Sequence, residues 1–341
     1  MLAGAANPIE NADLSEAAGR DGGNDHRLAF ARDLTQCLAE TPHIISPKYF
    51  YDEAGSLLFE RICELPEYYV TRTELDLLQR DLPAMAQTIG PNAEVLEFGA
   101  GSLLKARLLL RALESPRRFI AMDISGAHLQ AAAAQLQREF PTVEIIALEG
   151  DFNALDRLQG LPAIEPGSRR VGFFPGSTVG NLSPLEANRF LADSARLLAG
   201  GGLLIGVDLV KSPMVLHSAY NDAAGVTAAF NRNVLVRANR ELDAGFDIDS
   251  FAHYAFYEPR LQRIEMHLIC LRDQTVQIAD RRFTLRAGES IHTENSRKYT
   301  VEGFRTLAAS AGFTAKAVWC DPMQLFSLHW LASGVTGSEE R

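Results

Sequence analysis

A regular alternation of short apolar runs with amphipathic helical patterns, between residues 94 and 210, constrains the fold more than any other feature. Five runs have the composition and length of buried strands, at 94–98, 118–122, 143–148, 170–174 and 203–210. Apolar residues recur with helical spacing over 104–114, 126–140 and 184–200. Strands that are apolar throughout and separated by helices are typical of parallel sheets buried on both faces. The sequence therefore predicts an α/β fold with a doubly wound, Rossmann-like sheet.

The segments on either side of this region have different patterns. We expect helices over 28–40 and 55–65, and a third that begins at Thr71, where Thr71 and Glu74 form the pattern of a capping box. Residues 1–26 and 334–341 have no apolar period and are predicted to be tails.

The alternation stops after Pro213. A long helical stretch runs through 230–242, and β-forming segments follow at 251–258, 263–272 and 281–288. These segments predict antiparallel strands of a second, smaller α+β unit. A helix near 301–312 and apolar runs at 314–320 and 325–332 are expected to return to the first sheet as its closing strands.

Charge and composition exclude several classes of function. The chain has 341 residues with 33 Lys and Arg against 43 Asp and Glu, so its formal charge is −10 and it has no basic footprint for nucleic acid. Its four cysteines form no CxxC pair, and its eight histidines show no HxxxH spacing, so we expect reduced thiols and no bound metal. No signal-peptide pattern or long apolar stretch occurs, and we expect a cytoplasmic protein without a membrane contact.

The loop after the first predicted strand indicates a nucleotide site. Gly99 and Gly101 in EFGAGS permit a tight turn that a ligand can approach closely, although the third glycine of a GxGxxG fingerprint is missing. Asp123 ends the second strand, where a carboxylate can accept hydrogen bonds from ribose hydroxyls. Asp151 and Phe152 follow the third strand, where they would meet an adenine, and this favours S-adenosylmethionine (SAM) over NAD. Each carboxylate could instead cap a helix or face water.

The fourth strand leads into FPGSTVGNLSP, residues 174–184, at the carboxyl edge of the sheet where doubly wound folds bind ligands. The amide of Asn181 can hold a substrate carboxylate. The alternative is that Asn181 caps the helix that follows at Pro184.

Five separated motifs, in order along about residues 45–335, resemble the L-histidine Nα-methyltransferase family of the ergothioneine pathway. They are YFYDEAGSLLFERICELPEYYVTRTE, EFGAGS, FFPGSTVGNLSP, DLVKSPMVLHSAYNDAAGVTAAFNRNVL and HTENSRKY. The resemblance implies an enzyme that trimethylates the α-amine of histidine with SAM to give hercynine. It also implies a substrate-binding domain formed by 27–70 and 210–295, and a SAM-binding domain formed by 71–209 and 296–335. We expect a monomer that acts on a small molecule.

The same resemblance implies the residues of both sites. The SAM site comprises Gly99, Gly101, Lys105, Asp123, Asp151 and Phe152, and the substrate site comprises Tyr51, Tyr68, Gly176, Asn181, Tyr220, Glu294 and Ser296. By this similarity Tyr51 and the Gly176 carbonyl lie at the reacting amine. Tyr68, Asn181 and Tyr220 hold the substrate carboxylate, and Glu294 with Ser296 grips the imidazole.

Two assignments stay open at this stage. The turn continues as SLLK where the family would have a more polar sequence, which puts a contact between Lys105 and the SAM carboxylate in doubt. Either Tyr68 or Tyr69 could be the tyrosine that binds the substrate carboxylate. Three other functions are also considered: an N-methyltransferase for another amino acid such as tryptophan, a SAM-binding module without catalysis, and an NAD-dependent oxidoreductase. A carboxylate and a hydroxyl suit the two nitrogens of an imidazole better than a wholly apolar ring, which argues for histidine.

Overall fold

The computed structural model describes residues 13–101, 103–124 and 126–334. Contacts divide the chain into two compact units. Unit 1 comprises residues 1–59, 224–254 and 266–294, and unit 2 comprises 60–223, 255–265 and 295–341. Compared with the two domains expected from the sequence, residues 60–70, 210–223 and 255–265 belong to the larger unit 2.

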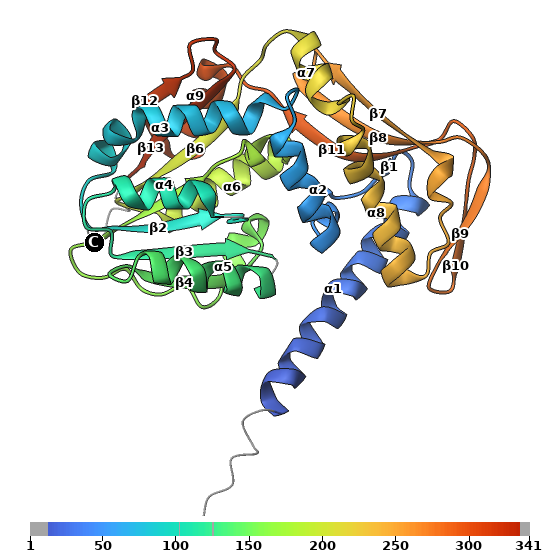
Figure 1. Ribbon diagram of the computed structural model, residues 1–341, viewed down its shortest axis with the longest axis horizontal. Helices are drawn as coiled ribbons and strands as arrows, with labels where there is room; N and C mark the ends of the chain where they lie inside the picture. The colour runs from blue at the N-terminus through green and yellow to red at the C-terminus, as the bar shows by residue number, and fades with distance from the viewer. Residues whose placement is uncertain (1–12, 102, 125, 335–341) are drawn as a thin grey trace, which may run out of the picture. The chain divides into compact units, whose positions relative to one another are not determined.

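Unit 2 is built on a seven-stranded sheet with the order β12-β13-β6-β5-β2-β3-β4 (Figure 1). Its strands are β2 (Ala93–Phe98), β3 (Arg118–Asp123), β4 (Glu144–Glu149), β5 (Arg169–Phe174), β6 (Gly202–Asp208), β12 (Phe313–Cys320) and β13 (Phe326–Ser333). Strands β2 to β6 pair in parallel, and β13 pairs antiparallel with β6 and β12. The Rossmann-like sheet and its two closing strands are therefore confirmed.

Helices follow the strands of unit 2 in the expected alternation. They are α3 (Tyr69–Ile89), α4 (Leu104–Ala112), α5 (Gly126–Glu139), η2 (Phe152–Arg157), η3 (Thr178–Asn181), α6 (Pro184–Leu197), α7 (Pro213–Tyr220) and α9 (Val301–Ser310). A large part of the core joins β5 and β6 to α6 and α9 through fully buried side chains such as Phe174, Ile205, Leu191 and Phe304. This burial fixes the carboxyl ends of the parallel strands, where the site residues lie.

The start of α3 differs from the sequence prediction. The helix begins at Tyr69 with Tyr68 as its N-cap, so Thr71 lies inside it and forms no capping box with Glu74. The carboxylate of Glu74 is fully buried and binds groups of the site described below. The S/T-x-x-E pattern was misleading because tertiary contacts, not the helix end, take the glutamate.

Unit 1 contains most of a four-stranded sheet, a two-stranded sheet and several helices. The elements that lie wholly in unit 1 are α1 (Asp13–Ala39), β1 (His43–Ile44), η1 (Pro47–Phe50), α8 (Val226–Leu242), η4 (Ile248–Ser250), β9 (Gln274–Ile278) and β10 (Arg281–Leu285). Four further elements have residues in both units: α2 (Glu53–Glu64), β7 (Phe251–Glu258), β8 (Arg263–Cys270) and β11 (Ser290–Arg297). The four-stranded sheet has the order β1-β11-β8-β7, and β9 pairs antiparallel with β10. Strands β7, β8 and β10 were predicted. Strand β11 was not, because Thr293, Glu294, Asn295 and Ser296 give it no apolar alternation.

The N-terminal prediction needs a correction. Helix α1 begins at Asp13, whereas residues 1–26 were expected to be a tail. The segment from Asp13 to Ala18 contains Leu, Glu and Ala, which have good helix propensity, and the two glycines at 22 and 23 do not break the helix. Residues 1–12 and 335–341 lie outside the described residues.

Candidate active site

The glycine turn after β2 has the geometry expected of a nucleotide-binding loop. Gly99 and Gly101 have φ of +69° and +47°, a left-handed conformation that favours glycine. The amide of Gly99 donates to Met122 O at 2.8 Å, and the amide of Gly101 lies 3.4 Å from Asp123 Oδ2. The turn after β2 is thus joined to the end of β3, and the structure brings together three of the predicted cofactor residues.

Phe152 joins the same region from the end of β4. A Cβ atom built on Gly99 would lie 3.7 Å from its ring, and the ring packs against Phe174 with centroids 5.2 Å apart. Asp151 caps η2, because its Oδ1 accepts from the amide of Asn153 at 2.8 Å. The capping role left open for Asp151 in the sequence is therefore present, at one of its two carboxylate oxygens.

Glu97 is a buried carboxyl that the sequence analysis did not single out. It is the last residue but one of β2, two residues before Gly99, and is almost wholly buried. Its Oε2 has no hydrogen-bond partner among the described residues. Burial raises the pKa of Glu97 well above its usual value, although the charge of Lys105 opposes this. A buried polar atom without a partner beside a glycine turn is suited to a ligand with its own donor or acceptor.

Glu74 links the cofactor side of unit 2 to the loop after β5. Its two oxygens each lie 2.9 Å from the amide of Gly176, and Lys105 Nζ lies 2.5 Å from Oε2. A Cβ atom on Gly206 would lie 2.4 Å from Glu74 Oε1, so the buried carboxylate requires glycine at that position. Lys105, predicted to contact SAM, is held by Glu74, and Gly176 is fixed in a left-handed conformation at φ +80°.

Tyr220 and Ser296 were predicted to bind different parts of the substrate, and the structure places them in direct contact. Tyr220 OH donates to Ser296 Oγ at 2.7 Å. Lys298, two residues beyond Ser296, donates to Ser296 Oγ at 2.8 Å and to Tyr220 OH at 3.1 Å. Lys298 had no predicted role, since a lysine in the polar motif HTENSRKY gives no signal that it is buried.

Asp208, at the end of β6, anchors this group of polar residues. Its carboxylate accepts from Lys298 Nζ at 2.7 Å, from Lys211 Nζ at 2.5 Å and from Tyr69 OH at 2.8 and 2.9 Å. Burial disfavours the charge of Asp208, but Lys298 and Lys211 outweigh it and lower the pKa of the carboxyl. We call Asp208, Lys211, Tyr220, Ser296, Lys298 and Tyr69 the Asp208 network. The Tyr69 hydroxyl is thus bound within this network.

Asn181 ends η3 and does not cap the next helix. Ser183 caps α6 instead, in a complete capping box with Glu186. The alternative for Asn181 considered from the sequence is therefore wrong. A Cβ atom on the preceding Gly180 would lie 2.7 Å from Arg297 O, so the loop that carries Asn181 passes directly against the end of β11.

In unit 1, Tyr51 follows η1 and is half-buried. Its ring meets Phe59 and Phe230 edge-on, at centroid distances of 5.7 and 5.6 Å. Asn233 of α8 donates to Phe50 O at 3.3 Å and to Asp52 Oδ1 at 2.7 Å, on both sides of Tyr51. Asn233 thus positions Tyr51. Asn233 lies in the sequence motif AAFNRNVL, which gave no indication of this role.

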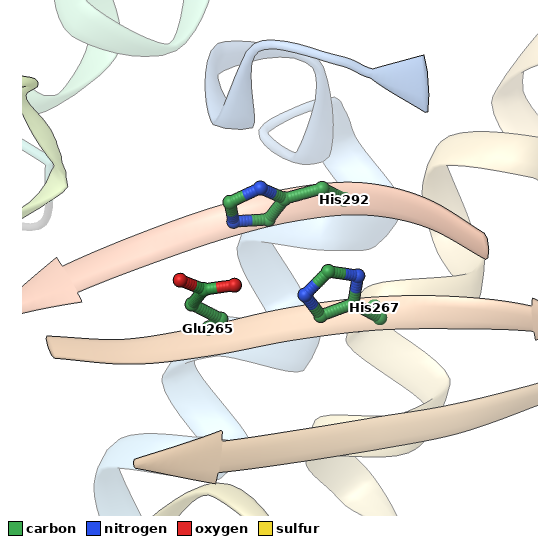
Figure 2. A group of neighbouring side chains, drawn as sticks. All are labelled: Glu265, His267 and His292. Atoms are coloured by element: carbon green, nitrogen blue, oxygen red, sulfur yellow. The ribbon is translucent and has the colours of Figure 1, made fainter. Parts of the chain in front are cut away.

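Within the part of the chain that the structure describes, one group of potential metal ligands comes together that no sequence spacing indicated. Figure 2 shows Glu265 and His267 of β8 with His292 of β11, and one ligand atom from each lies within 4.8 Å of the others. Arg263 donates to Glu265 Oε1 at 2.8 and 2.6 Å. His292 Nε2 lies 3.1 Å from Glu294 O, a hydrogen bond in which the ring nitrogen donates. We assign no metal to this group.

Comparison with known proteins decides the family. A sequence profile described as histidine-specific, SAM-dependent methyltransferase matches residues 30–333. The chain belongs to this family. It is 42% identical to a histidine N-α-methyltransferase of Mycolicibacterium smegmatis over 88% of this chain and 94% of that protein, and 40% identical to one of Mycobacterium tuberculosis over 91% and 96%. It is 29% identical to ergothioneine biosynthesis protein 1 of Neurospora crassa, over 85% of this chain and 33% of that protein.

The protein is accordingly a SAM-dependent methyltransferase with a Rossmann-like fold. Among its described residues, no helix is long and apolar enough to cross a membrane.

All four cysteines are free thiols, and burial raises the pKa of Cys37 to about 12, so that thiol stays protonated at neutral pH.

Proposed function

We propose that this enzyme transfers three methyl groups from SAM to the α-amine of L-histidine and so makes hercynine, the substrate of later steps of ergothioneine synthesis. The family match over residues 30–333 is the observation that carries the proposal. The contact between Tyr220 and Ser296 supports it, because two of the residues expected to bind one amino acid are neighbours in the fold.

The cofactor part of the proposal rests on the region around the glycine turn. We assign binding of the ribose hydroxyls to Asp123 and binding of the adenine to Asp151 and Phe152. Gly99 and Gly101 allow SAM to lie close to the backbone of the turn. These residues fit the group, since they offer a carboxylate, an aromatic face and an open turn. Glu97 adds a buried oxygen that needs a partner. Lys105 is bound to Glu74, and we assign it the role of fixing that carboxylate beside Gly176.

The substrate part assigns the carboxylate to Tyr68, Asn181 and Tyr220, and the imidazole to Glu294 and Ser296. Glu294 and Ser296 lie two residues apart on β11, and alternate residues of a strand point to the same face. Both are buried, with 9% and 5% of their surface exposed. A carboxylate and a hydroxyl suit the two nitrogens of an imidazole, because one can accept from the ring N–H and the other can bind the second nitrogen.

Methyl transfer requires these residues mainly to position the amine. Bound SAM supplies an activated methyl group on a sulfonium, so no acyl nucleophile or metal is necessary for the chemistry. Tyr51 and the Gly176 carbonyl orient the lone pair of the neutral amine toward the methyl group. The N–C bond forms as the S–C bond breaks, and the amine loses a proton before each later transfer. The ring of Tyr51 favours the permanent cation of the product by about 0.5–2 kcal/mol.

The proposal is tested with purified enzyme, SAM and a panel of free amino acids, with products read by mass spectrometry. Histidine should gain three methyl groups and tryptophan should not react. Preferred turnover of another amino acid would assign the enzyme to the alternative N-methyltransferase class, and SAM binding without any turnover would indicate a non-catalytic module.

We also propose that the enzyme is a cytoplasmic monomer. Gel filtration at micromolar concentration tests the oligomeric state.

A further inference from the structure

Lys298 is a charged side chain inside the protein, with 1% of its surface exposed. Its ammonium group lies 2.7 Å from Asp208 Oδ2, 2.8 Å from Ser296 Oγ and 3.1 Å from Tyr220 OH. An ammonium group has three N–H donors and no acceptor. All three protons of Lys298 are therefore directed at named oxygens, and two of these belong to proposed substrate-binding residues.

These bonds determine what the Ser296 hydroxyl can do. A hydroxyl has one proton to donate and two lone pairs that accept. Ser296 Oγ accepts from Lys298 at 2.8 Å and from Tyr220 OH at 2.7 Å, so both lone pairs are occupied. The proton of Ser296 is then the only part of the hydroxyl left for a ligand, which makes Ser296 a donor.

We propose that Lys298 is a positioning residue that fixes Ser296 as a hydrogen-bond donor and thereby makes the enzyme select the neutral imidazole ring of its substrate. This inference rests on the proposed function. A neutral imidazole has one N–H, which Glu294 can accept, and one nitrogen lone pair, which Ser296 can bind. An imidazolium has two N–H groups and no lone pair, so it leaves the Ser296 proton without an acceptor.

The charge of Lys298 acts in the same direction, because a fixed cation repels an imidazolium nearby. Burial alone would lower the pKa of Lys298, but the Asp208 carboxylate and the Tyr220 hydroxyl raise it overall, so Lys298 stays charged at neutral pH. Among the described residues, the charge of Lys298 acts on Lys211 after β6 and on Tyr257 of β7, and Tyr69 of α3 binds the shared Asp208. Burial lowers the pKa of Lys211 to about 8 despite Asp208, and the pKa values of Tyr69 and Tyr257 are raised, so none of these groups titrates between pH 5.5 and 7.

The test is the pH dependence of kcat/KM for histidine in the wild type, Lys298→Met and Lys211→Met. The α-amine of the substrate is protonated throughout pH 5.5–7, which gives log kcat/KM a slope of one. Protonation of the ring, with a pKa of about 6.5, should add a second unit of slope in the wild type as the pH falls below that value, so that the total slope approaches two near pH 5.5. Lys298→Met should lose this second unit, so that its activity relative to the wild type rises about tenfold between pH 7.5 and pH 5.5.

Lys211→Met is the matched control, because it removes a second buried lysine from the same Asp208 carboxylate without a bond to Ser296. It should keep the slope of two. Equal slopes in the two variants would overturn the inference and reduce Lys298 to a structural ion pair. If Lys298→Met does not fold, Ser296→Ala removes the donor while the lysine charge remains, so its slope should fall below that of the wild type, and an unchanged slope would also overturn the inference.

A substrate analogue separates this inference from the proposed function. Triazolylalanine keeps the amine and the carboxylate, and its ring stays neutral over this pH range, so the wild type should methylate it with a slope of one. A wild type that methylates histidine with a slope of one would contradict the inference alone. A wild type that does not methylate histidine at any pH would contradict the proposed function.

Discussion

Asp123 is the residue on which the proposed cofactor site depends most. It can accept hydrogen bonds from two ribose hydroxyls, each worth about 1.5–3 kcal/mol when the acceptor is charged. We therefore expect Asp123→Ala to weaken SAM binding roughly tenfold or more in calorimetry. Asp156→Ala removes an acid from an exposed ion pair with Arg189 and should leave the dissociation constant unchanged. An unchanged constant in Asp123→Ala would mean that Asp123 only caps the turn.

Glu294 is the residue that should distinguish histidine from tryptophan. Histidine and tryptophan share the amine and the carboxylate, so the side-chain pocket has to separate them. Loss of one hydrogen bond to a charged acceptor costs about 1.5–3 kcal/mol, and Glu294→Ala should lower kcat/KM for histidine roughly 10-fold to 150-fold. SAM affinity should stay the same, and activity on tryptophan should hold or rise because a buried charge has been removed.

The control for this variant is Glu302→Ala, an acid in the first turn of α9, which should behave as the wild type. A Glu294→Ala enzyme that keeps histidine kcat/KM within about threefold, or loses SAM binding in parallel, would show that the proposed imidazole pocket is wrong.

At the same scale, individual residues show where sequence reasoning succeeds. The positions of Gly99, Gly101 and Asp123 could be predicted, because the glycines follow β2, Asp123 ends β3, and parallel strands bring their carboxyl ends to one edge. The roles of Glu74, Asp208 and Lys298 could not, because each also binds groups that are distant in the chain. Glu74 binds Gly176 across 102 positions. The sequence alone does not show whether a polar residue is buried or exposed, because its burial depends on the packing of distant segments.

Among the elements, the close approach of η3 to β11 makes a prediction about Gly180. A methyl group there would lie 2.7 Å from a backbone oxygen, which cannot move like the end of a flexible side chain. We expect Gly180→Ala to lower stability by about 1–3 kcal/mol and to raise the KM for histidine, since η3 carries Asn181. Thermal unfolding and steady-state kinetics measure these effects.

Gly334→Ala is the comparison, because nothing lies within 4 Å of a Cβ atom at that position. It should leave both stability and KM unchanged. If Gly180→Ala has the stability and the KM of the wild type, η3 is not held against β11 in solution.

The elements also differ in how well their patterns predict them. Strands β2, β3, β5 and β6 are buried on both faces over most of their length, which explains why they were predicted with small differences at the ends. Strand β11 was missed because its buried positions include Thr293, Glu294 and Ser296. A strand that buries polar side chains has no apolar period. In this protein the strand without that pattern carries Glu294 and Ser296 of the proposed substrate pocket.

For the whole molecule, the stability in acid should depend on His329 of β13. The ring is fully buried, lies 2.9 Å from Ser327 Oγ, and has its pKa lowered to about 3 by burial. An unfolded histidine has a pKa near 6.5. Between pH 6.5 and 3 the unfolded chain therefore binds more protons at this site than the native protein, so the free energy of unfolding falls as the pH falls.

This contribution has a slope of up to about 1.4 kcal/mol per pH unit in that window. We expect His329→Leu to flatten the loss of stability between pH 6.5 and 4 in urea denaturation. His217→Leu, at an exposed position on α7, should keep the wild-type dependence. A parallel pH dependence in all three proteins would show that His329 is not buried as a neutral ring.

The overall architecture could be predicted from the order of its strands and helices, because short crossovers leave few ways to build a parallel sheet. The order β12-β13-β6-β5-β2-β3-β4 agrees with the predicted closing strands. The division into two units could be predicted only coarsely. Residues 255–265 include the end of one predicted strand of the smaller unit and the start of the next, yet they belong to unit 2, since contacts and not sequence order define a unit.

The central claim is that the enzyme methylates the α-amine of a substrate recognised as histidine. The most direct measurement is mass spectrometry with fragmentation of the products formed from SAM and either histidine or histamine, which lacks the carboxylate. We predict that histidine yields a product with three methyl groups, all on the α-nitrogen, and that histamine yields none, because the polar groups around Asn181 would be left without a partner. Methyl groups on the imidazole ring, or comparable turnover of histamine, would contradict the account.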